Sequence, residues 1–109
     1  MIRHTVVFSL HHPSGSAQEA AFLAEGRDLL TSIPGVYEFT VQRQVSPKSD
    51  LDFQFAMTFS DSAAFAAYDS HPIHVGFVRD RWVPEVAVFQ EYDFEEYEVG
   101  GGAASAEIV

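Results

Sequence analysis

Four histidine and tyrosine residues of this chain are candidates for proton transfer, and three of them are evenly spaced. Tyr68, His71 and His74 follow one another at intervals of three, which places side chains on one face of a continuous helix. A further histidine, His4, lies near the start of the chain. Imidazole is a base near neutral pH, and a phenol can donate a hydrogen bond to a developing oxyanion. If they converge on one cavity, His74, Tyr68 and His4 form a catalytic set that needs no cofactor.

The same residues have structural interpretations, which the sequence leaves open. His4 alternates with apolar residues, so it could be a core histidine whose ring finds a hydrogen-bond partner. Tyr68, His71 and His74 could instead pack a helix, and Pro72 bends the geometry between them. The spacing alone therefore does not decide between catalysis and packing.

The residue types disfavour a metal or cofactor site. The chain contains no cysteine, which excludes thiolate ligands and a cysteine nucleophile. His71 and His74 could chelate a metal, but zinc takes three or four ligands, and Asp69 is expected to point elsewhere on its helix. No glycine loop of the phosphate-binding type is present. We therefore expect no metal and no cofactor.

Hydrophobic periodicity predicts the elements that must position these residues. Strands are predicted over residues 2–10, 36–44, 51–59 and 83–94, with one helix between residues 16 and 33 and an interrupted helix between residues 60 and 82. A capping box of Ser16 and Glu19 starts the first helix, Ser60-Asp61 caps the second, and Pro72 begins its later segment. Alternation in the second strand puts Val36, Glu38 and Thr40 on one face and Tyr37, Phe39 and Val41 on the other. The β-α-β-β-α-β order predicts an α+β, ferredoxin-like domain with a four-stranded antiparallel sheet.

Length and the apolar faces of the strands bear on organisation and assembly. The 109 residues suffice for one domain, assigned to residues 1–97, and the glycine-rich residues 98–109 are predicted to be a flexible tail. The first and last strands are apolar on both faces. Val7, with either Val86 and Val88 or Ala87 and Phe89, should face away from the helices. A monomer would leave this patch in water, so we predict a homodimer packed through its sheet faces, a dimeric α+β barrel.

Charge and the start of the chain bear on partners and location. Six basic residues against sixteen acidic ones give a net charge of −10. Binding to nucleic acid or an anionic membrane needs clustered Lys and Arg, so neither partner is expected. The short apolar run at the start lacks the features of a signal peptide, and no stretch is long enough to span a bilayer. We expect a cytoplasmic protein.

Three segments of the chain resemble the stress-responsive A/B barrel (Dabb) family. They are His4 with Val6-Val7-Phe8, the Ile33-Pro34-Gly35-Val36 turn, and Tyr68 to Phe77, which reads YDSHPIHVGF. The resemblance implies a ferredoxin-like protomer in a dimeric α+β barrel. One plant member, olivetolic acid cyclase, closes a linear polyketide without a cofactor, and its reacting Tyr and His fall on Tyr68 and His74. Its first-strand His falls on His4, whereas a further His appears here as Phe53.

Two functional hypotheses follow. In the first, the protein binds or converts a small carbonyl or polyketide-like compound, with His74 as general base, Tyr68 orienting the substrate oxygen and His4 assisting. The residues expected to contact that ligand are His71, Phe8, Phe77 and Trp82. In the second, the protein is a non-enzymatic, stress-related structural dimer in which the same side chains serve the fold.

Overall fold

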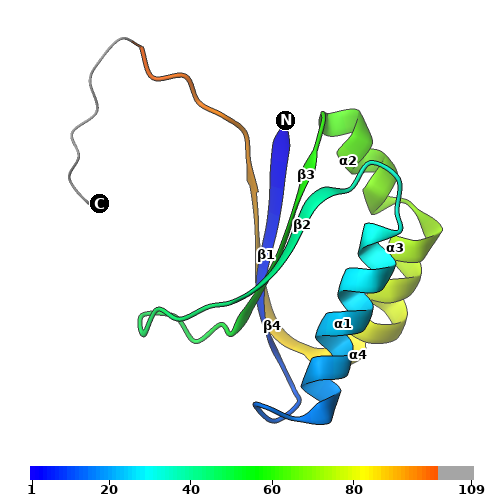
Figure 1. Cartoon of the computed structure of the whole chain (residues 1–109), viewed down its shortest axis with the longest axis vertical. Coiled ribbons are helices and arrows are strands. Elements are labelled where there is room, and N and C mark those ends of the chain that lie inside the picture. Colours follow the sequence, from blue (N-terminus) through cyan, green and yellow to red (C-terminus); the bar gives the residue numbers. More distant parts are fainter. Residues whose placement is uncertain (101–109) are drawn as a thin grey trace.

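A four-stranded antiparallel sheet carries all its helices on one face (Figure 1). The structure is a computed structural model and describes residues 1–100; residues 101–109, most of the predicted tail, lie outside the described part. The elements are β1 (Ile2–Leu10), α1 (Ala17–Thr31), β2 (Tyr37–Arg43), β3 (Phe53–Phe59), α2 (Ser62–Asp69), α3 (Pro72–Phe77), a π-helical turn (Val78–Trp82), α4 (Val83–Glu85) and β4 (Val86–Phe94). The strand order β2-β3-β1-β4 confirms the predicted ferredoxin-like arrangement.

The core lies between the sheet and the helices. The helix-facing residues of β1 and β3 sit opposite one another in antiparallel register: Ile2 with Phe59, His4 with Met57, Val6 with Phe55, and Phe8 with Phe53. Alternation with period two puts all of these side chains on the helix side, as predicted. The largest fully buried side chains are Phe8, Phe22, Phe55, Phe59 and Met57. The central strands β1 and β3 therefore supply most of the aromatic core.

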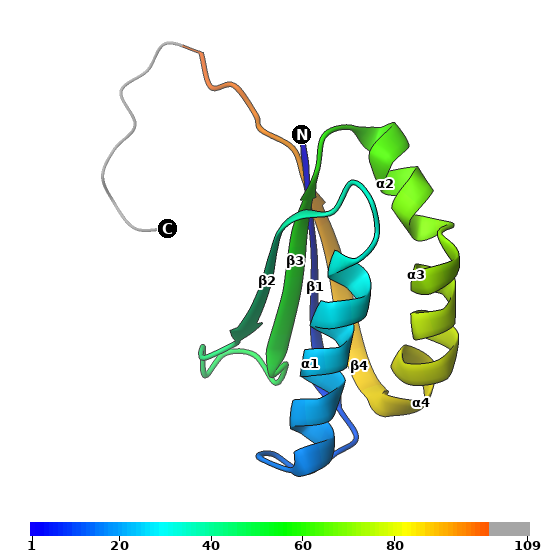
Figure 2. The same ribbon diagram turned by 45° about the vertical axis from the view of Figure 1, so that its right-hand side comes forward.

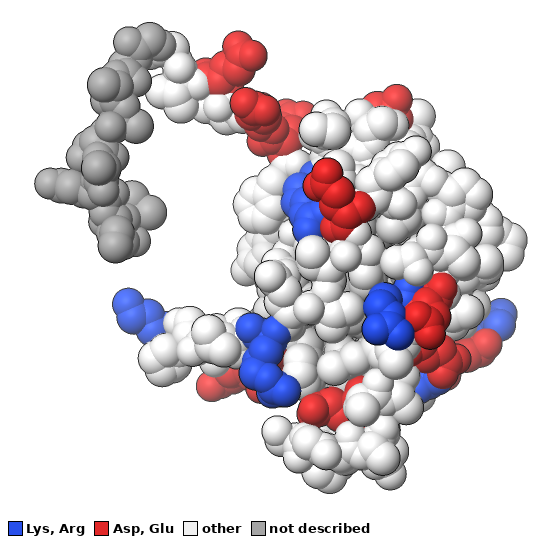
Figure 3. Space-filling view, in the orientation of Figure 1, with Lys and Arg blue, Asp and Glu red and all other residues white. Residues whose placement is uncertain are grey.

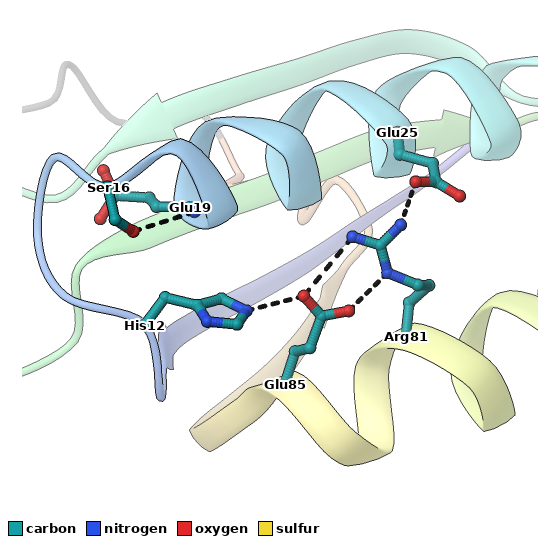
Figure 4. Close-up of polar contacts among 6 residues, drawn as sticks. All are labelled: His12, Ser16, Glu19, Glu25, Arg81 and Glu85. Atoms are coloured by element: carbon teal, nitrogen blue, oxygen red, sulfur yellow. Dashed lines mark hydrogen bonds and ion pairs between the residues drawn. The ribbon is translucent and has the colours of Figure 1, made fainter.

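Helix α1 begins where the capping pattern predicts. The Glu19 N–H donates to Ser16 Oγ at 3.2 Å, and the Glu19 carboxylate accepts from the Gly15 N–H at 3.2 Å. Figure 4 shows the Ser16–Glu19 bond. Farther along α1, the backbone at Gly26 approaches the sheet so closely that a Cβ there would come within 2.8 Å of the Phe55 ring. The missing side chain thus sets how near α1 lies to β3.

The second helical region is longer and more broken than predicted. Asp61 caps α2 by accepting from the Ala64 N–H at 2.8 Å, and Pro72 opens α3, both as expected. The helix then widens into the π-helical turn and continues through α4, so β4 begins at Val86 and the predicted start at Val83 is wrong. Pro84 has no N–H to donate to a helical carbonyl, and the Val83 N–H before it bonds five residues back, to Val78.

Strand β2 departs from simple alternation at a bulge. Glu38 has φ +51°, and the pairing with β3 shifts between Tyr37 and Thr40. Tyr37 therefore pairs with Thr58, whereas Val41 pairs with Phe55 on the helix side. The predicted common face is wrong for Tyr37, because one extra residue in the strand reverses the faces before it, whereas Phe39 packs against Phe55 on the same side as Val41.

A charged cluster joins segments that lie far apart in the sequence (Figure 4). Arg81 pairs with Glu85 and with Glu25 of α1, and Glu85 also accepts from His12 Nε2 at 2.7 Å. The side chains of Arg81 and Glu85 are only 24% and 17% exposed. The cluster links the segment after β1, helix α1 and the helical turn that leads into β4.

The opposite face of the sheet carries no helix in either ribbon view (Figure 2). On β4 this face presents Val88 and Tyr92, paired with Ser9 and Thr5 of β1, and both are about half exposed. Phe89 faces the helices instead, so the alternative of Ala87 with Phe89 is wrong, and of the other predicted pair only Val88 lies on this face. A bulge near Leu10 separates buried Val86 from Val88.

Charge on the drawn face of the molecule is uneven (Figure 3). Acidic side chains gather along the segment after β4, whereas the basic side chains are scattered. None of the helices within residues 1–100 has the length and apolarity needed to cross a membrane.

Candidate functional site

A cavity of about 350 Å³ lies between the helices and the β1–β4 side of the sheet. Its wall is mostly apolar, formed by Val6, Leu30, Phe55, Met57, Phe77, Val78, Trp82, Val83 and Phe89. Its polar side chains are His4, Tyr68, Asp69, His74 and Glu91. A concave apolar site with a few convergent polar groups is the usual form of a small-molecule site. The structure thus brings together His4, Tyr68 and His74, which lie far apart in the sequence.

His4 lies on the helix-facing side of β1 and is 6% exposed. Its Nδ1 is 2.6 Å from Oδ1 of Asp93, the residue directly opposite it on β4. A carboxylate accepts hydrogen bonds, so Nδ1 carries the proton and Nε2 is left as the basic nitrogen. The His4 ring packs at 4.8 Å from the Phe65 ring, which restricts its orientation. His4 is therefore an oriented imidazole with a charged partner.

Tyr68 lies at the end of α2 and is 2% exposed. Burial raises the pKa of the phenol well above its usual value, and the negative charges of Asp69 and Glu91 raise it further. The hydroxyl therefore stays protonated at physiological pH. It can act as a hydrogen-bond donor to a ligand oxygen, but not as a phenolate base.

His74 comes from α3 and meets Tyr68 across the break between the helices. The two ring centroids are 4.5 Å apart. His74 Nδ1 donates to the backbone carbonyl of Asp69 at 2.8 Å, which assigns the proton to Nδ1 and leaves Nε2 basic. Both cavity histidines thus have the same tautomer, one held by a carboxylate and the other by a carbonyl.

The other predicted ligand contacts divide into two groups. Phe77 and Trp82 line the cavity. Phe8 does not, because it is fully buried in the core against Phe22, Phe55 and Trp82.

His71 also lies outside the cavity wall. Its Nδ1 caps α3 by accepting from the Ile73 N–H at 3.2 Å. The spacing of three did not put it beside Tyr68 and His74, because the helix breaks between Asp69 and Pro72.

Three carboxylates lie at the site although the sequence did not predict a role for them there. Asp69, the last residue of α2, lines the cavity, where the sequence assigned it no role. Glu91 and Asp93 alternate with outward-facing residues on β4 and reach the site from the sheet edge. The sequence shows them only as two acidic residues of a largely apolar strand, and the pairing of β4 with β1 is what places them beside His4 and the cavity.

The geometry suits proton transfer better than metal chemistry. Within residues 1–100, no three His, Asp or Glu side chains converge as metal ligands. The cavity instead offers a neutral phenol donor and two imidazoles with basic Nε2 atoms. Such groups can take a proton from carbon or oxygen and donate a hydrogen bond to an oxygen of the same molecule.

Comparisons with known proteins place the chain in a family. Residues 2–96 match the family described as Stress responsive A/B Barrel Domain, or Dabb. A crystal structure of a Dabb family protein with a ferredoxin-like fold from Mesorhizobium loti is 52% identical, with a TM-score of 0.88; the match covers 89% of this chain and 97% of that one. No functionally curated protein matches the chain.

Two more distant structures share the fold. A hydroxynitrile lyase from Passiflora edulis is 17% identical, with a TM-score of 0.78 and coverage of 92% of this chain and 96% of that one. A dimeric ferredoxin-like protein of unknown function from Thermobifida fusca is 20% identical, with a TM-score of 0.71 and coverage of 85% and 88%. The match along nearly the whole domain and the identity to the Mesorhizobium protein agree: the chain belongs to the stress responsive A/B barrel (Dabb) family.

Proposed function

We propose that this protein binds, and chemically converts, a small carbonyl or polyketide-like compound in the cavity, without a cofactor. The observation that supports the proposal is the convergence of His4, Tyr68 and His74 on one mostly apolar cavity. An apolar wall suits the body of such a molecule, and the three polar groups can contact its oxygen and its acidic hydrogen.

Each polar side chain has a role in this proposal. Tyr68 donates a hydrogen bond to the carbonyl oxygen and so stabilises the charge that develops there. Nε2 of His74 takes the proton from the adjacent carbon as general base. His4, oriented by Asp93, positions the substrate or returns the proton. Phe77 and Trp82 contact its apolar part.

The fold is compatible with such chemistry. The Passiflora edulis structure is a hydroxynitrile lyase, so an enzyme is built on the same arrangement of strands and helices. Its 17% identity extends the likeness to the fold alone. The proposal for this chain therefore depends on its own residues.

A homodimer packed through the sheet faces completes the proposal. The helix-free face presents Val88, Tyr92 and Phe94, which are 59%, 48% and 56% exposed. The Thermobifida fusca protein of the same fold is described as dimeric. Burying two such faces against each other removes apolar surface from water. The other predictions, no nucleic-acid or membrane partner and a cytoplasmic location, stay predictions.

Native mass spectrometry of the gently purified protein tests the binding function. It measures the mass of the assembly and of any retained small molecule together. A ligand retained by the parent and by His11→Ala, but lost by His74→Ala, supports the cavity as its site. His11 is the matched control because its side chain is exposed.

A second variant separates the base from the hydrogen bond. The side-chain nitrogen of His74→Asn can still donate to the Asp69 carbonyl, but the variant lacks the basic Nε2. We expect it to remain folded and to lose turnover of the ligand found by mass spectrometry. Unchanged turnover would contradict the role of His74 as base.

The structural dimer remains a second candidate, favoured by one contact. The bond from His74 to the Asp69 carbonyl joins α3 to the end of α2. In this alternative His74→Ala lowers the free energy of unfolding by about 0.5–1.5 kcal/mol, the usual net contribution of a hydrogen bond whose acceptor water can reach, and no ligand is lost. His74→Asn would then restore the stability, and the protein as purified would carry no small molecule.

A further inference from the structure

We propose that the cavity selects uncharged molecules with a carbonyl or hydroxyl oxygen and rejects carboxylates and phosphate esters. This inference rests on the proposed function, in that it assumes the cavity binds a ligand, and it adds the charge class of that ligand. It depends on which charged side chains line the cavity and on where the basic side chains of the same region are engaged.

The charges at the cavity are all negative. Asp69 and Glu91 line it, and Asp93 stands behind His4. No Lys or Arg of residues 1–100 belongs to its wall. Binding sites for carboxylates and phosphates typically present Arg or Lys, or several backbone N–H groups, to balance the charge. Nothing of that kind faces the ligand space here.

The two arginines of the π-helical turn are engaged with carboxylates. Arg79 lines a shallow groove that adjoins the cavity, and its guanidinium donates twice to the Asp80 carboxylate, at 2.7 and 2.9 Å. Arg81 pairs with Glu85 and Glu25 on the side of the helix turned toward α1. Each arginine thus has a carboxylate partner, which reduces the positive charge available to a ligand.

The Tyr68 hydroxyl is buried beside two negative charges, those of Asp69 and Glu91. Burial is the largest cause of its raised pKa, and the charges of Asp69 and Glu91 add to it. A carboxylate placed beside the Tyr68 hydroxyl would experience the same two effects, loss of hydration and like-charge repulsion. An uncharged oxygen there accepts the phenolic hydrogen bond without either cost.

A cation is disfavoured for a different reason. Most of the wall is aliphatic or aromatic, including Leu30, Met57 and Phe77, and it cannot replace the hydration of an ammonium group. Of the acidic groups, Asp93 already accepts a hydrogen bond from His4, and an ammonium group would lose its hydration against this wall before it reached the others. The cavity therefore best fits a molecule with no net charge.

Three probes of matched shape test this selectivity on the full chain. They are 4-phenyl-2-butanone, which is uncharged, 3-phenylpropanoate, an anion, and 4-phenyl-2-butylammonium, a cation. Trp82 is the only tryptophan of the chain and lines the cavity, so its fluorescence reports occupancy. We expect the ketone to bind at least about tenfold more tightly than either charged probe, as close like charges and buried ions are disfavoured by that much or more.

A pair of charge-matched variants locates the cause. Glu91→Gln should reduce the ratio of the dissociation constants of phenylpropanoate and ketone by at least about threefold. Glu98→Gln removes the same formal charge beyond β4, outside the cavity, and should leave the ratio unchanged. Equal effects of the two variants would mean that net charge, not the cavity, sets the preference, and would overturn the inference.

The outcomes separate the inference from the proposed function. Binding of phenylpropanoate or of the ammonium probe as tight as binding of the ketone overturns the charge selectivity but leaves a ligand-binding cavity. No change in Trp82 fluorescence with any of the three probes counts against the cavity as a binding site, and so against both proposals. A preference for the ketone that depends on Glu91 supports both.

Discussion

At the scale of single residues, the cavity histidines are held by their Nδ1 atoms. His4 donates to a carboxylate and His74 to a backbone carbonyl, at 2.6 and 2.8 Å. The first contact joins two strands, whereas the second joins two successive helices. A carboxylate partner also stabilises the imidazolium that forms when the base takes a proton. Asp93 is thus a positioning residue for His4.

Replacement of Asp93 should change the tautomer of His4. In Asp93→Ala we expect His4 to change from the Nδ1–H to the Nε2–H tautomer, since the acceptor for Nδ1 is gone. Asp93→Asn keeps an oxygen acceptor, so His4 should retain the Nδ1–H tautomer in that variant. Nitrogen-15 chemical shifts of the His4 ring, measured in alkaline buffer where imidazoles are neutral, distinguish the two forms. Glu95→Ala, two residues farther along, is the control. An identical His4 spectrum in Asp93→Ala would show that Asp93 does not set the tautomer.

At the scale of elements, close packing of α1 on β3 depends on Gly26. The ideal Cβ position at Gly26 lies 2.8 Å from Phe55 and 3.2 Å from Phe77. Phe55 and Phe77 also line the cavity, so the distance between helix and sheet bears on the cavity's shape. Gly76 of α3 differs, because its nearest neighbour would be the end of the Arg79 side chain at 3.8 Å.

Alanine at these two glycines should have opposite effects. Gly26→Ala is expected to lower the free energy of unfolding by about 1–3 kcal/mol, because the buried Phe55 ring must shift. Gly76→Ala should raise it by about 0.5–1 kcal/mol, since alanine favours the helix and the space is open. Urea unfolding measures both. A stabilising Gly26→Ala would mean that α1 moves away from the sheet at little cost.

The charged cluster around Glu85 should make stability depend on pH. Burial acts to raise the pKa of Glu85, but hydrogen bonds from Arg81 and His12 outweigh it and hold the pKa below its usual 4.5. A folded-state pKa below the unfolded one adds stability above pH 4.5, and this is lost as pH falls through the folded value. Glu85→Gln should therefore cost about 1 kcal/mol near neutral pH and less below pH 4.5.

Unfolding curves of the parent and of Glu85→Gln across this pH range test the linkage. Glu98→Gln, in the segment after β4, is the matched control. Its free energy of unfolding should differ from that of the parent by the same amount at every pH. A gap between parent and Glu85→Gln that stays constant from neutral to acid pH would contradict the linkage.

At the scale of the whole molecule, the two faces of the sheet have different environments. The helices cover one face and the cavity lies beneath them, whereas the other face presents half-exposed apolar side chains on β4. A patch of this kind typically marks an interface. The proposed dimer would bury this patch and leave the helices on the outside of the assembly.

One pair of valines tests this assembly. Val88→Asp places a charge on the helix-free face and should convert the dimer, near twice 12.1 kDa, into a monomer. Val75→Asp introduces the same change on the exposed side of α3 and should leave the dimer intact. Light scattering coupled to size-exclusion chromatography measures both. A dimeric Val88→Asp variant, or a monomeric parent, would contradict assembly through this face.

Local patterns predicted most elements because their causes are local. The Ser16–Glu19 box starts α1, Asp61 caps α2, and strict alternation orients β1 and β3. The error in β2 has a non-local cause. The bulge at Glu38 depends on pairing with β3 and on Arg3, which donates to the Glu38 carbonyl at 2.7 Å from another strand.

The sequence by itself determined the family and the order of the elements, because a motif and a hydrophobic period are properties of neighbouring residues. It also singled out His4, Tyr68 and His74. Only the tertiary structure decided that they meet, since strand register and the crossing of helices over the sheet set distances between residues far apart in the chain. That same register places Asp93 opposite His4 and Glu91 at the cavity, where their chemistry depends on what they face.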